Sequence, residues 1–361
     1  MNLALYEFGT AQPIHSIAQP EAADIAATFS GLPPEQTRSL HALYRRTRIE
    51  RRGSVLLEHP AGIEPRQTFM PPACDEFDHG PTTALRMQRY AEEAPVLALT
   101  AAREALDGSD LVPREITHLI TVSCTGFVAP GFDIRLIKSL KLSRSVARTH
   151  VGFMGCHGAL NGLRVAAALA RTRRKARVLL CATELCSLHY QYGPDAEKLV
   201  ANAIFADGAA ALVCGRPRAA TEWRLTRSGS YLFPNSEDAM SWRVGNHGFE
   251  MTLSARVPQL IASHLRPWME SWLAKVGLDL AAIGSWAIHP GGPRILDQAA
   301  AGLGLPRSAT ETSQRVLAEC GNMSSPTVLF ILQRLRRQQA RLPCVALAFG
   351  PGLVVEAALF Q

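Results

Sequence analysis

The sequence predicts an α/β protein, and three observations lead to this fold class. Short apolar segments alternate with helical segments from about residue 115 onward. The chain has 361 residues, of which 47% are hydrophobic and 19% charged, so it can bury a large core in roughly two domains. A strand, loop, helix and strand pattern also occurs twice. We therefore expect two similar halves, residues 1–215 and 216–361.

The predicted elements lie between turn residues and follow the spacing of apolar side chains. Strands are expected at 118–122, 177–182, 209–214, 285–288, 344–349 and 353–359. Helices are expected at 95–106, 157–171, 258–275, 294–301 and 327–337. Ser325 is the expected N-cap of the last helix, with Pro326 at its first position.

The internal repeat aligns four polar residues. The strand that ends near Cys124 is followed 32 residues later by Cys156 and a helix, and the strand that ends at His289 is followed 33 residues later by Asn322 and a helix. Cys124 therefore corresponds to His289, and Cys156 to Asn322. If the halves pack about a pseudo-twofold axis, a thiol, an imidazole and a carboxamide meet at one point.

These three groups fit nucleophilic catalysis. Cys156 follows a glycine at a helix start, where the helix dipole favours a thiolate. His289 ends a strand before Pro-Gly-Gly-Pro, and its imidazolium would stabilise that thiolate. N–H groups of His289 and Asn322 aimed at one oxygen would form an oxyanion hole. The alternatives are a buried cysteine, a structural histidine and a turn asparagine.

Composition and charge limit the partners, metals and cellular locations that the sequence allows. Lys and Arg exceed Asp and Glu by seven, so an anionic partner is expected, such as a phosphorylated cofactor, nucleic acid or an acidic surface. The eight cysteines include no zinc-type spacing, so no metal is expected. No apolar run is long enough to cross a membrane, and the opening MNLALYEFGT lacks the basic start of a signal peptide. A cytoplasmic protein without membrane insertion is predicted.

Five motifs together resemble those of type III polyketide synthases, the chalcone synthase-like enzymes: VGFMGCHGALNGLRVA, NAIFADGAAALV, SWAIHPGGPRILDQ, CGNMSSPTVLFIL and AFGPGLVVE. The resemblance implies a thiolase-like five-layered αβαβα fold and an obligate homodimer. It implies an acyltransferase that uses acyl-CoA and malonyl-CoA as substrates, with no separate cofactor. It assigns Cys156 as nucleophile and His289 and Asn322 as its partners in decarboxylative Claisen condensation.

The same resemblance implies roles for further residues. Phe205 matches the aromatic residue between the CoA tunnel and the reaction chamber, and Gly350, Pro351 and Gly352 match the loop that shapes the cavity floor. Other expected cavity residues are Cys124, His189, Trp242, Met251 and Ser324. Arg46 matches the region that receives CoA phosphates, with Arg45 and Arg48 as weaker candidates, and Arg294 is a second candidate for CoA binding.

Departures from the plant pattern bear on the substrate. Cys124, Cys186 and His189 replace threonines, and Trp242 replaces a glycine, which disfavours a flat aromatic starter. A medium or long fatty acyl-CoA is expected instead, with an alkylpyrone or alkylresorcinol as product. A malonyl-CoA-only tetrahydroxynaphthalene synthase and a ketoacyl-carrier-protein synthase III stay open as alternatives.

Two further classes fit less well. A nucleic-acid-binding module would rest on the arginine clusters at 45–52 and 171–177, but the sequence has no recognisable zinc, helix-turn-helix or RNA-binding motif. A non-catalytic CoA binder would not need the intact Cys, His and Asn set.

Overall fold

A nine-stranded mixed sheet runs through the whole protein, with strand order β11-β12-β13-β8-β1-β7-β6-β4-β5. The computed structural model describes residues 2–30, 32, 34–64, 66–173, 175–219 and 223–361. We call the first-half strands the N-terminal arm: β1 (Leu3–Ala11), β4 (His118–Ser123), β5 (Ala147–Gly152), β6 (Arg177–Leu185) and β7 (Asp207–Gly215). The C-terminal arm comprises β8 (Arg224–Leu232), β11 (Ser285–Ile288), β12 (Cys344–Gly350) and β13 (Val354–Phe360).

The two arms repeat one topology. β4 and β6 are parallel, as are β11 and β12, and the next two pairings toward the middle of the sheet are antiparallel in each arm. β1 meets β8 through the pairs Leu3 with Leu225 and Ala4 with Arg224, which joins the arms. The strand order therefore matches the repeat read from the sequence, with β5 added at one edge.

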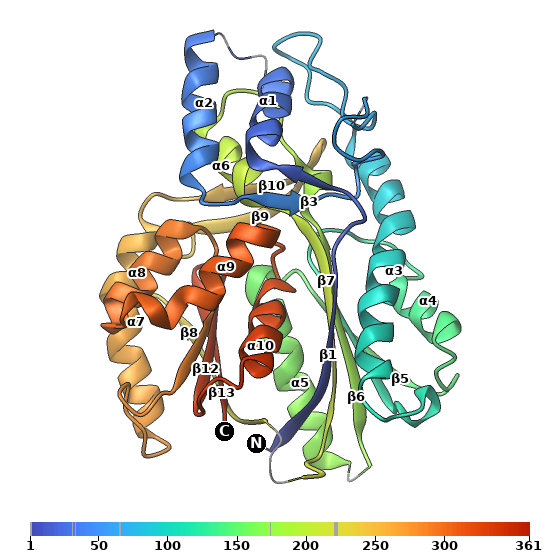
Figure 1. Ribbon diagram of the computed structural model, residues 1–361, viewed down its shortest axis with the longest axis vertical. Coiled ribbons are helices and arrows are strands. Elements are labelled where there is room, and N and C mark those ends of the chain that lie inside the picture. The colour runs from blue at the N-terminus through green and yellow to red at the C-terminus, as the bar shows by residue number, and fades with distance from the viewer. Residues whose placement is uncertain (1, 31, 33, 65, 174, 220–222) are drawn as a thin grey trace.

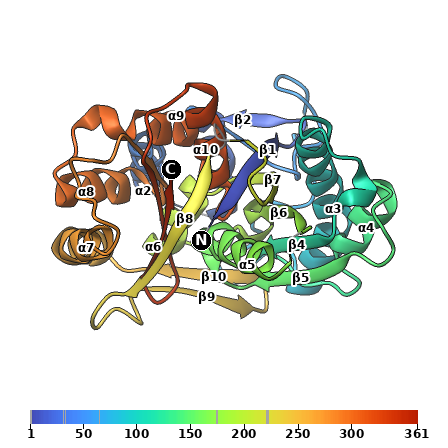
Figure 2. The ribbon, with the colours of Figure 1, turned by 90° about the horizontal axis from the view of Figure 1, so that it is seen from below.

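Helices lie between and outside the arms (Figures 1 and 2). α5 (Gly158–Thr172) contacts β4, β6 and β13, and α10 (Thr327–Arg337) contacts β7, β11 and β12, so both lie between the arms. α3 (Thr83–Asp107) and α4 (Phe132–Ser139) cover the outer face of the N-terminal arm, and α7 (Val257–Ala274) and α8 (Pro293–Leu303) that of the C-terminal arm.

The central helices are buried over most of their surface because strands cover them from both directions. Val328, Ile331, Leu332 and Leu335 form one apolar face of α10, and the structure also buries Leu329 and Phe330. A helix that is apolar around its circumference is typical of a fully enclosed position. Likewise β4 and β7 are continuous apolar strands rather than alternating ones, since both of their faces are covered.

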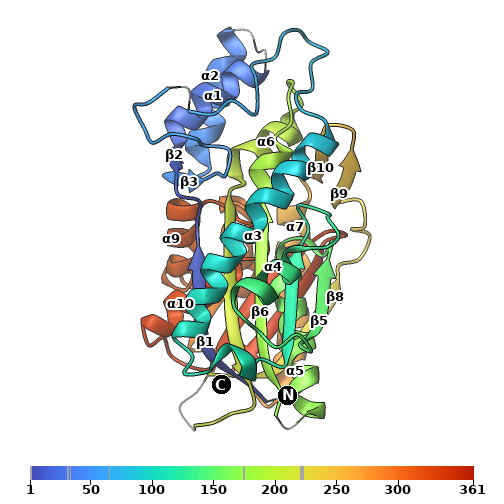
Figure 3. The same cartoon turned by 90° about the vertical axis from the view of Figure 1, so that its right-hand side faces the viewer.

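A third group of elements lies at the end of the molecule opposite both termini (Figures 1 and 3). It contains α1 (Gln19–Ser30), α2 (Pro34–Arg46) and α6 (Ala196–Ile204), with the short strand pairs β2 (Ser16–Ala18) with β3 (Arg51–Gly53) and β9 (Met240–Gly245) with β10 (Gly248–Leu253). α9 (Glu311–Cys320) contacts β3 and α10. No helix within the described ranges is both long and apolar enough to cross a membrane.

Most of the helices and strands predicted between residues 95 and 359 are confirmed, with bounds that differ by a few residues. α3 begins 12 residues before the predicted start, because Pro95 lies inside the helix rather than at its first turn. The N-cap prediction for α10 is wrong: Pro326 occupies that position, and the Ser325 hydroxyl instead donates to Glu184 at 2.6 Å.

Candidate active site

Cys156 lies in a one-turn 3-10 helix, Gly155–His157, that leads into α5 between the two arms. Gly155 has φ +67°, and a Cβ at this position would lie 2.5 Å from Pro351 Cδ. The position therefore requires glycine on both conformational and steric grounds. Cys156 is only 8% exposed, and its side chain faces an enclosed chamber.

We call this space the reaction chamber, a cavity of about 30 Å³. Its walls come from both arms, the β9–β10 pair and the end of α6. The lining residues are Cys124, Thr125, Gly155, Cys156, Cys186, Phe205, Met240, Ser241, Trp242, Met251, Ser324 and Pro351. Seven of the predicted site residues are among them: Cys156, Cys124, Phe205, Trp242, Met251, Ser324 and Pro351.

Asn322 is held by backbone pairing beside Phe205. Its N–H donates to Ile204 O at 2.9 Å, and its carbonyl accepts from Ala206 N–H at 2.9 Å. The side-chain oxygen accepts from Ser324 N–H at 2.8 Å, which leaves the Nδ2 group without a partner among the described residues. The buried amide is thereby left with donor capacity beside Cys156.

His289 follows β11 and is fully buried. Its N–H donates to Leu347 O of β12 at 2.7 Å, which fixes the backbone at the strand end. Neither ring nitrogen has a hydrogen-bond partner in the part of the chain that the structure describes. Burial, and to a smaller extent the charge of nearby His157, lower the pKa of the imidazole to about 3.

The protonation of Cys156 differs from the sequence expectation. The helix dipole predicted a thiolate, but burial raises the pKa of the thiol to about 11, and the charge of Glu184 acts in the same direction. The polar side chains of Ser324 and Asn322 beside the thiol offset only part of this rise. Without substrate, the site therefore holds a thiol and a neutral imidazole.

Glu184, which the sequence reasoning missed, organises the polar wall of the chamber. It is the second-last residue of β6 and accepts from Cys124 N–H at 2.9 Å, Thr125 Oγ1 at 2.7 Å and Ser325 Oγ at 2.6 Å. Burial raises its pKa, and these hydrogen bonds oppose that rise. The carboxylate links the loop after β4 to the loop before α10. A charged residue at the end of a fully apolar strand was the available signal.

Trp242 and His189 form a second, more rigid wall. The Trp242 indole N–H donates to Cys124 O at 2.7 Å, and its ring meets His189 edge-on with centroids 5.5 Å apart. His189 Nε2 lies 2.7 Å from Thr125 O, and its Nδ1 accepts from Phe249 N–H at 2.9 Å. Ser324 has φ +56°, and its Oγ lies 3.6 Å from Cys124 Sγ.

A larger apolar cavity of about 110 Å³ lies behind this wall, toward α1 and α6. Its lining includes Ile17, Ala22, Ile25, Ala26, Phe29, Leu56, Leu57, Met70, His189, Ala201 and Phe249. Cys186, Phe205, Trp242 and Met251 line both this apolar cavity and the reaction chamber. The two spaces are therefore separated by side chains alone.

The loop between β12 and β13 forms one wall of the chamber. Pro351 lines it, and Gly352 has φ +75° and donates its N–H to Met240 O at 2.8 Å. A Cβ at Gly350 would lie 2.3 Å from His157 Cδ2, so this glycine makes room for the histidine ring.

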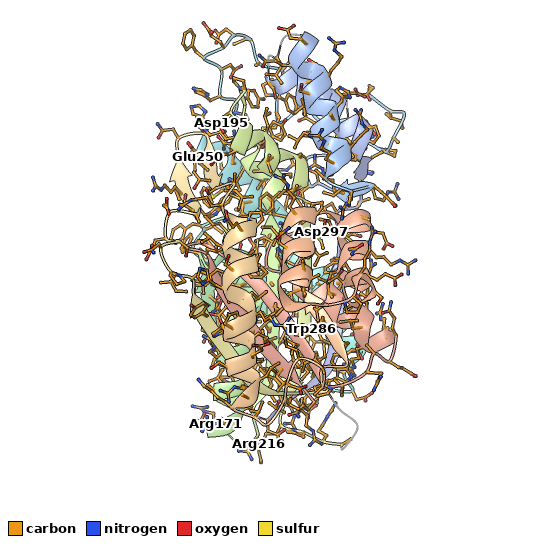
Figure 4. The ribbon with its side chains drawn as sticks, turned by 90° about the vertical axis from the view of Figure 1, so that its left-hand side faces the viewer. Arg171, Asp195, Arg216, Glu250, Trp286 and Asp297 are labelled. Carbon is orange, nitrogen blue, oxygen red and sulfur yellow. The ribbon has the colours of Figure 1, made fainter. Side chains whose placement is uncertain are left out.

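The structure places the predicted CoA-binding arginines outside both cavities. Arg46 ends α2 and Arg294 begins α8, and both are exposed. Arg48 pairs with Asp297 of α8, which Figure 4 labels, with Nη2 to Oδ2 at 3.0 Å. The arginine that reaches the apolar cavity is Arg52, which is buried and donates to the Asn202 and Phe205 carbonyls at 2.6 and 2.7 Å.

Comparisons with known proteins agree with this arrangement. Residues 3–217 match the family model of the N-terminal domain of chalcone and stilbene synthases, and residues 224–361 match that of the C-terminal domain. The chain is 34% identical to the "alpha-pyrone synthesis polyketide synthase-like Pks18" of Mycobacterium tuberculosis, covering 98% of this chain and 89% of the relative. It is 32% identical to a 1,3,6,8-tetrahydroxynaphthalene synthase of Streptomyces peucetius, covering 98% and 91%.

Solved structures give the same result. The crystal structure of PKS-I from the brown alga Ectocarpus siliculosus superimposes with a TM-score of 0.93 at 30% identity, over 100% of this chain and 98% of that one. The C-terminal type III polyketide synthase domain of Steely1 from Dictyostelium gives 0.90 at 28% identity, over 100% and 99%.

The family models and the similar proteins define an enzyme of the acyl-transferring class. The chain belongs to the chalcone and stilbene synthase family, and it is a type III polyketide synthase, an acyltransferase that condenses CoA thioesters. The fold is the mixed α/β fold of these enzymes.

Proposed function

We propose that this enzyme loads a medium or long fatty acyl group from acyl-CoA onto Cys156, extends it with malonyl-CoA, and cyclises it to an alkylpyrone or alkylresorcinol. The observation that carries this proposal is the apolar cavity, which adjoins the reaction chamber across four shared side chains. Its aliphatic and aromatic lining suits a flexible hydrocarbon chain, and each buried methylene contributes ~0.8 kcal/mol.

Loading begins with proton transfer from Cys156 Sγ to a free nitrogen of His289. The thiolate attacks the thioester carbonyl of the starter, and the oxyanion accepts a hydrogen bond from the His289 imidazolium. Collapse of this intermediate expels CoA and leaves the acyl chain on Cys156. The unpartnered nitrogens of His289 support these roles, since a buried donor without a partner is poised for one that arrives.

Extension uses His289 together with a second donor, Asn322 Nδ2. They hold the thioester carbonyl of malonyl-CoA, so that loss of carbon dioxide places negative charge on that oxygen. The resulting enolate carbon attacks the acyl group on Cys156 and releases the thiolate. Phe205 and Met251 lie between the two cavities and supply an apolar wall that disfavours the charged malonyl carboxylate.

Two alternative functions differ from this one in the source of the acyl group. The relative from Streptomyces is named a tetrahydroxynaphthalene synthase, and such an enzyme would use malonyl-CoA alone. A ketoacyl-carrier-protein synthase III would take its acyl group from a carrier protein. The name of Pks18 and the apolar cavity favour the alkylpyrone assignment.

Further parts of the proposal concern assembly. We assign a thiolase-like five-layered architecture in two halves, 1–215 and 216–361, supported by the repeated strand order. A homodimer is supported by Phe127 and Phe153, 69% and 54% exposed, which follow the neighbouring strands β4 and β5. Binding of CoA phosphates by Arg46 and Arg294 and a cytoplasmic location stay predictions from the sequence.

The test is covalent trapping. Incubation with a fatty acyl-CoA should add one acyl mass to the intact protein, located on the peptide that contains Cys156. Cys156→Ala should acquire no acyl mass and should lose all condensation, whereas Cys124→Ala, the matched chamber cysteine, should still be acylated. Acylation of another residue with Cys156→Ala still active would refute the assignment.

A further inference from the structure

His157, the residue after the proposed nucleophile, begins a buried polar chain that the catalytic steps above do not use. Its Nδ1 lies 2.8 Å from Asn161 Oδ1, and Asn161 Nδ2 donates to Glu356 Oε1 at 3.1 Å. The other oxygen of Glu356 is bound by Arg164. His157, Asn161 and Arg164 lie on one face of α5 and its preceding turn, and Glu356 belongs to β13, so the chain crosses between two layers.

This chain fixes the tautomer of His157. The carboxylate of Glu356 can only accept, so the amide of Asn161 must present its NH2 to Glu356 and its oxygen to His157. Nδ1 of His157 is therefore the donor, and Nε2 carries the lone pair. The ring is 4% exposed, and Nε2 has no hydrogen-bond partner within the described ranges.

The free nitrogen lies close to the base of the proposed reaction. His157 packs against Gly350 at the end of β12, and the backbone N–H of His289 is bonded to Leu347 of the same strand. Ile288 of β11 pairs with Leu347 of β12, so His289 lies beside Ala348, two residues from Gly350 and on the same face of the sheet as the His157 ring. A charge on His157 also acts on His289. The charged or titratable groups around this pair are Glu356, Arg164 and Cys156, with Glu184 beyond Cys156.

We propose that His157 is a positioning residue for His289, and that its Nε2 lone pair, oriented by Asn161 and Glu356, stabilises the His289 imidazolium formed when Cys156 loses its proton. This inference rests on the proposed function. The imidazolium has two N–H groups, one for the substrate oxyanion and one for an acceptor. His157 supplies that acceptor through one water, because neither ring nitrogen of His289 contacts a hydrogen-bond partner among the described residues. A charge-assisted hydrogen bond of this kind is stronger than the one that neutral His289 would make.

The proposal answers a difficulty posed by the site itself. Burial opposes both charges of a thiolate and imidazolium pair, as the raised pKa of Cys156 and the lowered pKa of His289 show. An acceptor that is already oriented costs no reorganisation when the charge appears.

The experiment is the pH dependence of Cys156 alkylation by iodoacetamide, followed by mass spectrometry of the Cys156 peptide. His157→Phe keeps a flat ring against Gly350 and removes the acceptor. It should move the profile to higher pH by about one unit, which is a tenfold slower reaction on the rising limb. His157→Gln, which restores an acceptor, should recover part of the shift. Asn161→Leu keeps the His157 ring but removes the acceptor that fixes its tautomer. It should shift the profile in the same direction by a smaller amount. This variant provides the test if His157→Phe does not fold.

A double-mutant comparison separates positioning from a structural role. In a His289→Phe background, His157→Phe should cause no further shift, because the residue through which it acts is gone. A His157→Phe profile that superimposes on the wild type, or an equal shift with and without His289, would overturn the inference. If His289→Phe alone leaves the profile unchanged, the pairing under the proposed function fails, whatever His157 does.

Discussion

The reaction chamber and the apolar cavity share four wall residues but differ in almost everything else. The chamber is small, and its lining carries thiols, hydroxyls and the loops anchored by Glu184, with His289 and Asn322 leaving three side-chain nitrogens unpaired nearby. The apolar cavity is larger and is lined mainly by carbon, contributed by α1, α6 and the segment around Leu56. Under the proposed function, bond making belongs to the reaction chamber and selection of the acyl chain to the apolar cavity.

This difference indicates which substitutions should lower the reaction rate and which should alter the choice of starter and hence the product. Substitutions around the chamber remove donors or acceptors that act in the transition state. Substitutions around the apolar cavity alter how many methylenes are buried, so they should change the preference among starters while leaving the chemistry intact.

The largest effect is expected at the oxyanion donors. Asn322→Ala should slow malonyl-CoA decarboxylation by ~10² to 10³ while Cys156 is still acylated, because the amide is not the base. His289→Ala should impair both steps. Release of labelled carbon dioxide and the acyl mass of the protein measure the two steps separately. Equal decarboxylation in wild type and Asn322→Ala would contradict this division of roles.

An intermediate effect is expected from filling the apolar cavity. Ala201 lines it from α6, so Ala201→Phe should shift the preferred starter to shorter acyl chains, with a loss of about fourfold for each methylene excluded. Ala196→Phe makes the same change at an exposed position of the same helix and should leave the chain-length profile unchanged. Competition between acyl-CoA lengths is the measurement. The same shift in both variants would show that the cavity does not select the chain.

The smallest effect is expected at the shared wall. Trp242→Gly removes the indole between the two spaces and its hydrogen bond to Cys124 O, so the ratio of pyrone to resorcinol should change severalfold. Trp242→Phe keeps most of the volume without the donor and should change the ratio less. Chromatographic product ratios at matched conversion measure this effect. An unchanged ratio in Trp242→Gly would mean that the wall does not shape cyclisation.

Much of the architecture around Cys156 was readable from the sequence, and the reason is the repeat. Two strand, loop and helix units at nearly equal spacing predicted that α5 and α10 would occupy equivalent places, and the strand order confirms that correspondence. The helix over 327–337 matches the observed bounds of α10, since its apolar residues and its proline start gave unambiguous signals.

The remainder depends on contacts between segments that are distant in the chain. Ala26 of α1, Met70 and Ala201 line the same apolar cavity, and no local sequence pattern predicts that these three residues come together. Ser325 bonds Glu184 rather than capping its own helix, because a buried carboxylate 141 residues away competes for its hydroxyl. The thiol form of Cys156 likewise follows from complete enclosure, which outweighs the helix dipole visible in the sequence.

The most direct test of the fatty acyl assignment is the mass-spectrometric product profile of the wild-type enzyme with malonyl-CoA alone and with a ladder of acyl-CoA lengths. Turnover should rise with chain length until the apolar cavity is full, and the products should carry the starter as an alkyl substituent on a pyrone or resorcinol ring. A pentaketide naphthalene formed from malonyl-CoA alone, at a rate that no acyl-CoA exceeds, would contradict the assignment and identify a tetrahydroxynaphthalene synthase instead.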